Sequence, residues 1–211
     1  MKPIPTMAKK DNGPAKTNAA RLLDAAGISY ELVPYEVDES DLAAQHVADQ
    51  LGEDIEQVFK TLVLRGDRNG LFVCVIPGNF EVDLKVAAQL SGNKNCEMLH
   101  VKELLPTTGY IRGGCSPIGM KKPFPTFIHE SALLYDYIFV SAGIRGLQLK
   151  IAPQDLIDFV GAELYPLQAI PFSRKQTILR LSRERPGVVI VGGRRNSPLQ
   201  MSERPVCRRR I

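Results

Sequence analysis

Hydrophobic residues recur at helical spacing near the start of the chain. Over residues 17–26 the apolar positions lie three and four apart, which places them on one face of a helix. A Thr or Asn before this run is a typical N-cap, and Gly27 is a typical end. We therefore predict a helix over residues 17–26.

The period becomes strand-like further along the chain. Residues 58–64, VFKTLVL, and the apolar run LFVCVI flank the turn sequence GDRNG, which predicts two strands of a hairpin. Residues 28–37 are also predicted to be extended. Pro34 within them predicts a sheet edge or a bend.

Helices and strands are interspersed over the rest of the chain. Helices are predicted over residues 41–51 between Ser40 and Gly52, over residues 83–91, over VKELL with its end at Pro106, and over QDLIDFVG. Strands are predicted at TFIHE, YIFVSAG and LQLKI. This order predicts an α/β or α+β fold with a mixed or largely antiparallel sheet.

The chain of 211 residues suits one domain with appendages, at roughly 150 residues per domain. Residues 1–15 are polar, contain Pro and Gly, and are predicted to be disordered. The domain is predicted to span residues 16–168. Residues 169–211 form an Arg-rich tail that is also predicted to be disordered, although GVVIVGG within it has a strand pattern.

Composition narrows the class of protein. Hydrophobic content of 44% and charged content of 24% are ordinary for a soluble globular chain. No window approaches the ~20 apolar residues of a membrane span, so no membrane association and a cytoplasmic location are predicted. The net charge of +4 arises from the basic residues from Arg174 onward, so the body is slightly acidic. Cysteines without a close pair and scattered histidines predict no metal site, and no nucleotide or other cofactor motif is present.

Lys60 is the first candidate functional residue. Alternation in residues 58–64 places it on the same strand face as Leu62 and Leu64. An ammonium group on an apolar face needs a partner. Two interpretations follow from the pattern: a cation over a pocket that stabilises an oxyanion, or a strand-end lysine that extends to water.

Two glycine-containing loops are further candidates. Residues 113–119, GGCSPIG, precede two lysines and suit a close backbone approach to an anion, or an ordinary turn. Residues 140–146, VSAGIRG, suit a pocket-lining loop or a β-turn. Cys115 in the first loop is a weak candidate nucleophile, because none of the histidines is near it in sequence.

Four sequence blocks, and the order in which they occur, resemble the YbaK/EbsC family of aminoacyl-tRNA deacylases. They are AARLLDAAGISYELVPYE, QVFKTLVL, TTGYIRGGCSPIGMKK and IFVSAGIRGLQL, within residues 17–165. The family is similar to the editing domain of some prolyl-tRNA synthetases. The resemblance implies a single α/β (α+β) domain with a curved mixed sheet flanked by helices.

The resemblance also implies a set of site residues. Lys60 matches the family's key lysine, which contacts the tRNA 3′ end or the scissile ester. Gln148 stands where some members have an aspartate, so a carboxylate role is not implied there. The other matching positions, implied to bind substrate, are Tyr35, Thr61, Tyr110, Gly113, Gly114, Ser116, Pro117, Ser141 and Gly143.

The implied activity is trans-editing: hydrolysis of Cys-tRNA(Pro), or Cys-tRNA(Cys), with attack by the substrate's own thiol. The implied partners are the aminoacyl-tRNA 3′ end and a prolyl-tRNA synthetase complex, and the Arg-rich tail is a candidate for RNA contacts. Two alternatives stay open from the residues. One is a deacylase for another mischarged tRNA such as Ala-tRNA(Pro), and the other is a non-catalytic tRNA- or synthetase-binding module.

Overall fold

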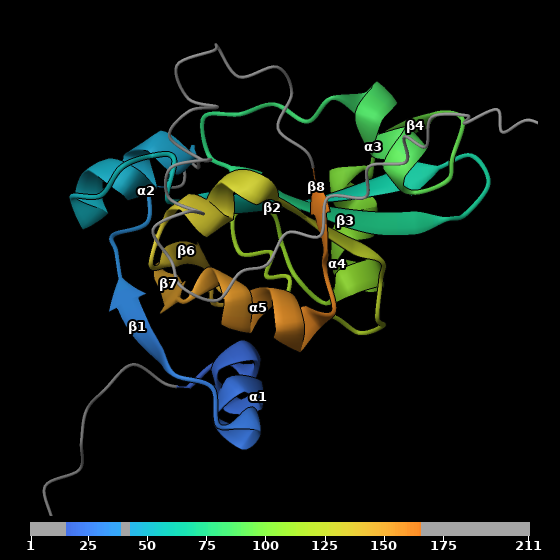
Figure 1. Ribbon diagram of the computed structural model, residues 1–211. Coiled ribbons are helices and arrows are strands. Elements are labelled where there is room, and N and C mark those ends of the chain that lie inside the picture. Colours follow the sequence, from blue (N-terminus) through green and yellow to red (C-terminus); the bar gives the residue numbers. More distant parts are fainter. Residues whose placement is uncertain (1–15, 39–42, 166–211) are drawn as a thin grey trace, which may run out of the picture. The chain divides into compact units, whose positions relative to one another are not determined.

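Two sheets make up the centre of the computed structural model, which describes residues 16–38 and 43–165 (Figure 1). One is antiparallel with the strand order β1-β7-β6, and the other is mixed with the order β4-β2-β3-β5-β8. Their strands are Tyr30–Pro34 (β1), Phe59–Gly66 (β2), Leu71–Pro77 (β3), Cys96–Met98 (β4), Thr126–His129 (β5), Ile138–Ser141 (β6), Leu147–Ile151 (β7) and Glu163–Tyr165 (β8).

The predicted hairpin is confirmed as β2 and β3, which pair antiparallel with Lys60 opposite Ile76. β3 and β5 run parallel, as do β5 and β8, so this sheet is mixed as expected. A single parallel bridge between Val58 and Phe139 joins it to the antiparallel sheet. β1 is an edge strand, in agreement with Pro34 at its end.

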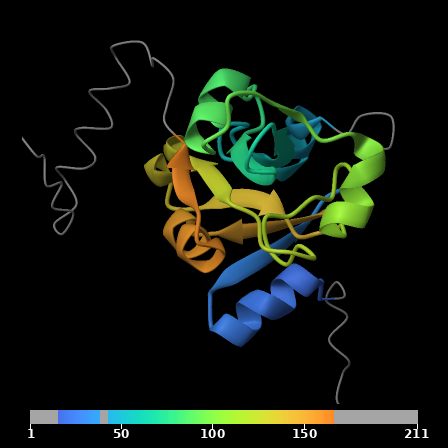
Figure 2. The same ribbon diagram turned by 90° about the vertical axis from the view of Figure 1, so that its right-hand side faces the viewer.

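The first helix forms where its capping residues predict it. Thr17 is the N-cap, and its side chain accepts a hydrogen bond from the Ala20 amide at 3.2 Å. Gly27 ends the helix with a φ of 69°, a conformation that glycine adopts without strain. The helices are Asn18–Ala26 (α1), Ala44–Leu51 (α2), Leu84–Leu90 (α3), Val101–Thr108 (α4) and Pro153–Val160 (α5), with a 3₁₀ turn at Glu130–Leu134. Figure 2 shows α1 beside β1, away from the mixed sheet.

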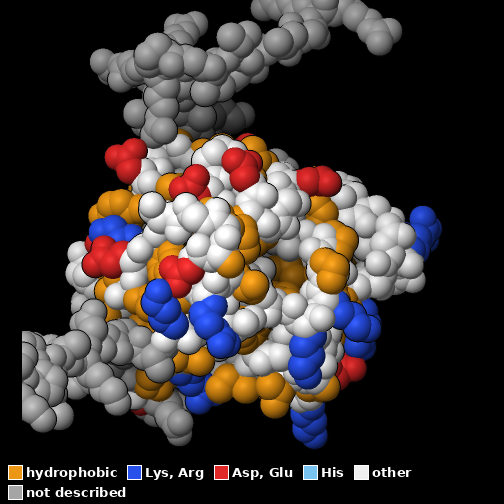
Figure 3. Space-filling model, turned by 90° about the horizontal axis from the view of Figure 1, so that it is seen from below, with side chains coloured by type: hydrophobic (Ala, Val, Ile, Leu, Met, Phe, Trp, Pro, Cys, Tyr) orange, Lys and Arg blue, Asp and Glu red, His pale blue; other side chains and the backbone are white. Residues whose placement is uncertain are grey.

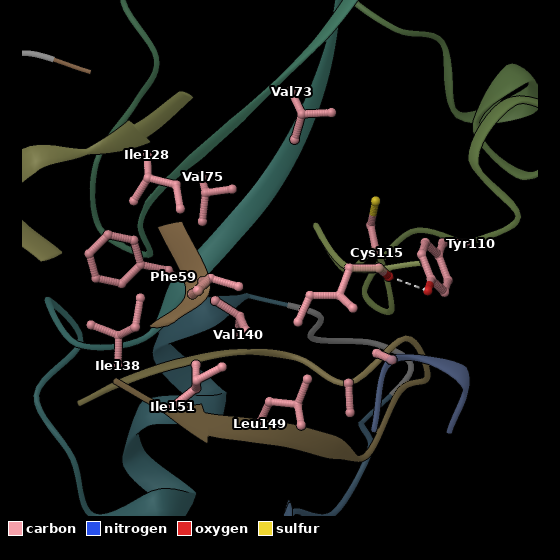
Figure 4. Packing of buried hydrophobic residues seen from close by; sticks show 14 of the residues in the cluster. Phe59, Val73, Val75, Tyr110, Cys115, Ile128, Ile138, Val140, Leu149 and Ile151 are labelled. Atoms are coloured by element: carbon pink, nitrogen blue, oxygen red, sulfur yellow. Dashed lines mark hydrogen bonds between the residues drawn. The ribbon is translucent and has the colours of Figure 1, made fainter. Parts of the chain in front are cut away.

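The main core lies between the two sheets (Figure 4). Phe59 and Val75 of the mixed sheet share one hydrophobic cluster with Ile138 and Leu149 of the antiparallel sheet. A second cluster on the other face of β3 contains Cys74, Ile76 and neighbouring apolar residues. Because β3 is covered on both faces, its sequence is a continuous apolar run rather than an alternating one.

Some element boundaries differ from the prediction. The VKELL helix does not end at Pro106 but continues to Thr108 and is capped by Gly109. Pro106 lacks only one amide donor, and the Lys121 ammonium donates to the carbonyls of Leu105 and Pro106 at 3.3 Å each. The predicted 41–51 helix begins at Ala44 in the described residues, and its expected Ser40 cap lies outside them. The short strands β4 and β8 and the 3₁₀ turn were not predicted.

The predicted disorder of residues 1–15, the tail 169–211 and the strand pattern GVVIVGG concern segments outside the described residues. They stay predictions. Within the described ranges, no helix has the length and hydrophobicity needed to cross a lipid bilayer.

Candidate active site

A cavity of about 550 Å³ lies where β2, α2 and the ends of β6 and β7 meet the loop after α4. Its wall is mostly apolar, with a few polar groups, which is the usual composition of a small-molecule site. Half of the residues named from the resemblance line it: Tyr35, Lys60, Thr61, Gly113 and Ser141. The fold therefore brings together residues that are up to about a hundred positions apart.

Lys60 is a half-buried cation in the cavity wall. Its ammonium donates a hydrogen bond of 2.9 Å to the Gly78 carbonyl, directly after β3. Burial lowers the pKa of Lys60, and the Glu81 carboxylate opposes part of this shift. The side chain thus lines the cavity in place of extending freely to water.

The close packing of α2 explains why the residue whose carbonyl holds Lys60 is a glycine, Gly78. A Cβ atom on Gly78 would lie 2.5 Å from the Ala44 Cβ and 2.8 Å from the Ile55 Cδ1. Only glycine therefore lets the first turn of α2 pack against this carbonyl. Ala44 also lines the cavity, so the same contact sets the position of α2 beside Lys60.

The other five residues named from the resemblance, Tyr110, Gly114, Ser116, Pro117 and Gly143, are not among the cavity lining. The Tyr110 hydroxyl donates to the Ile118 carbonyl at 2.6 Å, which closes the glycine loop (Figure 4). Gly143 has a φ of 97°, and a Cβ there would lie 2.8 Å from the Tyr110 ring.

Further backbone and side-chain contacts fix the glycine loop, residues 113–119. A Cβ on Gly114 would lie 3.1 Å from the Arg145 amide nitrogen, so the two glycine-containing loops pack backbone to backbone. Ser116 is fully buried, and its hydroxyl accepts a hydrogen bond from the Ile118 amide at 3.3 Å. These contacts hold Gly113 at the cavity.

Two oxygen atoms among the lining residues have no hydrogen-bond partner. They are Thr61 Oγ1 on β2 and Gln148 Oε1 on β7, and both are inaccessible to solvent in the described structure. Gln148 is only 6% exposed. A buried polar group without a partner costs about 1–3 kcal/mol, so a side-chain rotation that brings either oxygen to a donor of a bound ligand would recover that cost.

Cys115 does not supply a nucleophilic thiolate, and the described residues contain no cluster of metal ligands. Burial raises the pKa of Cys115 to about 12, which keeps it a thiol near neutral pH. No group of three or more His, Cys, Asp or Glu in the described part of the chain is arranged to hold a metal ion.

The sequence did not single out His46, which also lines the cavity, on α2. Its Nε2 lies 2.6 Å from Gln50 Nε2. That amide nitrogen also donates to the Glu36 carbonyl, while Gln50 Oε1 accepts from the Glu36 amide. Since the Gln50 nitrogen is a donor, His46 Nε2 is the acceptor of this hydrogen bond.

Known proteins are similar to this chain in sequence. The family described as "Aminoacyl-tRNA editing domain" matches residues 39–159. Over 157 residues the chain is 49% identical to the Enterococcus faecalis protein named "Putative Cys-tRNA(Pro)/Cys-tRNA(Cys) deacylase EbsC", a match that covers 74% of this chain and 95% of that one. The chain therefore belongs to the aminoacyl-tRNA editing domain family.

Two more distant matches agree with this assignment. A proline–tRNA ligase of Fervidobacterium nodosum is 31% identical over 78 residues, which cover 37% of this chain and 13% of the ligase. A solved structure titled "Crystal structure of a putative trans-editing enzyme for prolyl tRNA synthetase" has a TM-score of 0.63 at 24% identity, over 73% of this chain and 99% of that one. The latter shows that the α/β fold expected from the sequence is shared.

Proposed function

We propose that the protein is a trans-editing enzyme that removes cysteine from Cys-tRNA(Pro), and from Cys-tRNA(Cys) as a second substrate. The observation that carries this proposal is the half-buried Lys60 ammonium in the wall of a mostly apolar cavity. The 49% identity to a protein named for this activity supports the choice of substrate.

The proposed chemistry needs little more than positioning and charge. An aminoacyl ester is already activated, so a cation beside its carbonyl oxygen stabilises the charge that develops during cleavage. In this proposal Lys60 and the glycine loop at Gly113 hold the carbonyl and the terminal adenosine. Cysteine and proline are similar in size, so a synthetase pocket rejects cysteine poorly and a second site is needed.

The substrate's own thiol is the proposed nucleophile. Its sulfur attacks the ester carbonyl, a C–S bond forms, and the ester C–O bond breaks. The proton of the thiol passes to the departing 3′ oxygen of the tRNA, and water later opens the cyclic thiolactone. The high pKa of Cys115 agrees with a route that needs no thiolate from the protein.

A comparison of aminoacyl groups tests this assignment. Rapid loss of cysteine from Cys-tRNA(Pro), with slow loss of alanine from Ala-tRNA(Pro), supports the thiol route. A preference for alanine would keep the deacylase function but exclude a thiol as the nucleophile. Binding of both substrates without turnover would instead indicate a non-catalytic module.

Thr61 and Thr126 provide a matched pair of variants for the cavity. In this proposal Thr61 Oγ1 contacts the bound substrate, so Thr61→Val is expected to lower kcat/KM about tenfold. Because this oxygen has no hydrogen-bond partner among the described residues, the stability of the variant is expected to be unchanged or to rise by up to about 1 kcal/mol. Thr126→Val removes a hydroxyl that donates to the Phe124 carbonyl at 2.9 Å, outside the cavity lining.

For Thr126→Val we expect the opposite outcome: lower stability by about 1 kcal/mol and unchanged activity. Urea unfolding and deacylation kinetics of both variants give the comparison. Equal activity of Thr61→Val and wild type would exclude Thr61 Oγ1 as a substrate contact.

The proposed partners are the aminoacyl-tRNA 3′ end and a prolyl-tRNA synthetase that delivers it. The relation to proline–tRNA ligases supports this association. The Arg-rich segment 169–211 lies outside the described residues, and its contact with RNA phosphates stays a prediction.

A further inference from the structure

Helix α4 and its flanking residues expose four large apolar side chains. Val101 is 59% exposed, Leu105 is 50% exposed, and Met98 and Ile111 are each 43% exposed. We call these four residues the α4 surface. Val101 and Leu105 are one helical turn apart and therefore lie on the same side of α4.

Basic side chains accompany the α4 surface. Lys102 follows Val101, Arg112 follows Ile111, and Lys121 and Lys122 are exposed. Lys121 is placed by its own contacts, because its ammonium donates to the carbonyls of Leu105 and Pro106.

Acidic groups offset little of this charge. Glu103 on α4 forms an ion pair with Arg65 at 3.0 Å, and Glu97 is exposed on β4. Although the body is slightly acidic as a whole, charge is not mixed evenly over it. On the face drawn in Figure 3, most basic side chains gather in one half, among hydrophobic ones, and most acidic side chains in the other.

The α4 surface is continuous with the cavity. Two residues of the α4 surface, Met98 and Val101, also line the cavity. The neighbouring Arg112 lines the cavity as well. From the cavity mouth at Val101, one helical turn of about 5.4 Å along α4 leads to Leu105. Lys121 stands beside Leu105 through its contact with the end of the helix.

We propose that the α4 surface binds the unpaired 3′-terminal nucleotides of the tRNA. This inference rests on the proposed function, in which the aminoacyl ester occupies the cavity. Apolar side chains pack against the faces of the bases, and the neighbouring cations bind the phosphates, as in sites for single-stranded nucleic acids. An apolar strip bordered by cations and joined to the cavity fits an RNA strand better than a mixed-charge protein surface.

Binding of uncharged tRNA(Pro) by the full chain tests the apolar contacts independently of catalysis. The probes are the intact tRNA and the same tRNA without its 3′ C-C-A nucleotides. We expect wild type to bind the intact tRNA about tenfold more tightly than the shortened one. The double variant Leu105→Gln with Ile111→Gln is expected to abolish that difference.

Leu84→Gln is the matched control, since Leu84 is 41% exposed at the start of α3, outside the α4 surface and the cavity lining. It is expected to keep the preference for intact tRNA. If the double variant keeps the preference as well, the proposal is overturned. It is also overturned if the double variant instead fails to bind prolyl-tRNA synthetase with its tRNA affinity unchanged, because the surface is then a protein interface.

The salt dependence of tRNA binding tests the contribution of the lysines beside the α4 surface. Lys102→Glu with Lys122→Glu is expected to flatten the slope of log K against log salt by about 0.7 for each phosphate that the variant no longer neutralises. Lys85→Glu on α3 reverses one exposed charge outside the α4 surface and is expected to leave the slope unchanged. Equal slopes for all three proteins would exclude phosphate binding here.

Absence of deacylation by wild type, with these binding results intact, would contradict the proposed function and not this inference.

Discussion

Replacing Lys60 by alanine is expected to lower kcat/KM for Cys-tRNA(Pro) hydrolysis by about 10²–10³-fold, the usual cost of removing one group that stabilises a developing oxyanion. Lys60 lines the cavity half-buried, and its ammonium is fixed by the Gly78 carbonyl. Because this cation is preorganised in a largely apolar wall, water substitutes for it poorly. Single-turnover deacylation measures the effect directly.

Lys150 supplies the matched control. Its ammonium lies 3.8 Å from the centre of the Tyr137 ring, and it is not among the cavity lining. Lys150→Ala removes a cation–π contact, so we expect reduced stability with activity unchanged. For Lys60→Ala we expect activity to be lost with little change in stability, because relief of the cation's desolvation offsets loss of the hydrogen bond to the Gly78 carbonyl. Full activity of Lys60→Ala would exclude Lys60 as the catalytic cation.

Acid is expected to destabilise the protein through His129. This side chain is 4% exposed, its Nδ1 lies 2.7 Å from the Ser131 hydroxyl, and its ring packs edge-on against Phe80. Burial lowers the pKa of His129 from 6.5 to about 4. The unfolded state therefore binds a proton between these two values while the folded state does not, and stability falls as the pH is lowered through that range.

The contribution of His129 is about 3 kcal/mol, fully present above pH 6.5 and lost as the pH approaches 4. His129→Asn keeps an acceptor for the Ser131 amide but removes the titrating ring. Urea unfolding of both proteins at pH 7 and pH 4.5 isolates the effect from that of the carboxylates. The stability difference between the two pH values is expected to be smaller for the variant. An equal loss in both proteins would contradict the assignment.

Much of the local structure follows from short sequence patterns. Thr17 and Gly27 delimit α1 because their capping contacts lie within one helical turn of each. The β2–β3 hairpin follows from alternation and a turn sequence, and the strand period places Lys60 on the face of Leu62 and Leu64. Pro106 was misleading, because a proline in the last turn of α4 removes one donor without ending the helix.

The arrangement of the site depends on contacts that no local pattern contains. Ala44 packs on Gly78 because α2 crosses the end of β3, and spacing in the sequence cannot predict that approach. The residues named from the resemblance divide into those that line the cavity, such as Tyr35, and those that support its loop, such as Tyr110. Likewise, the unpaired oxygen of Gln148 depends on what surrounds it in three dimensions.

The proposed role of this cavity is hydrolysis of the ester of Cys-tRNA(Pro). The most direct test is the time course of cysteine release from that tRNA, with and without the purified full chain, under single-turnover conditions. We predict that release with the protein is far faster than spontaneous hydrolysis, and that Lys60→Ala returns it almost to the spontaneous rate. Release at the spontaneous rate with wild-type protein would contradict the account.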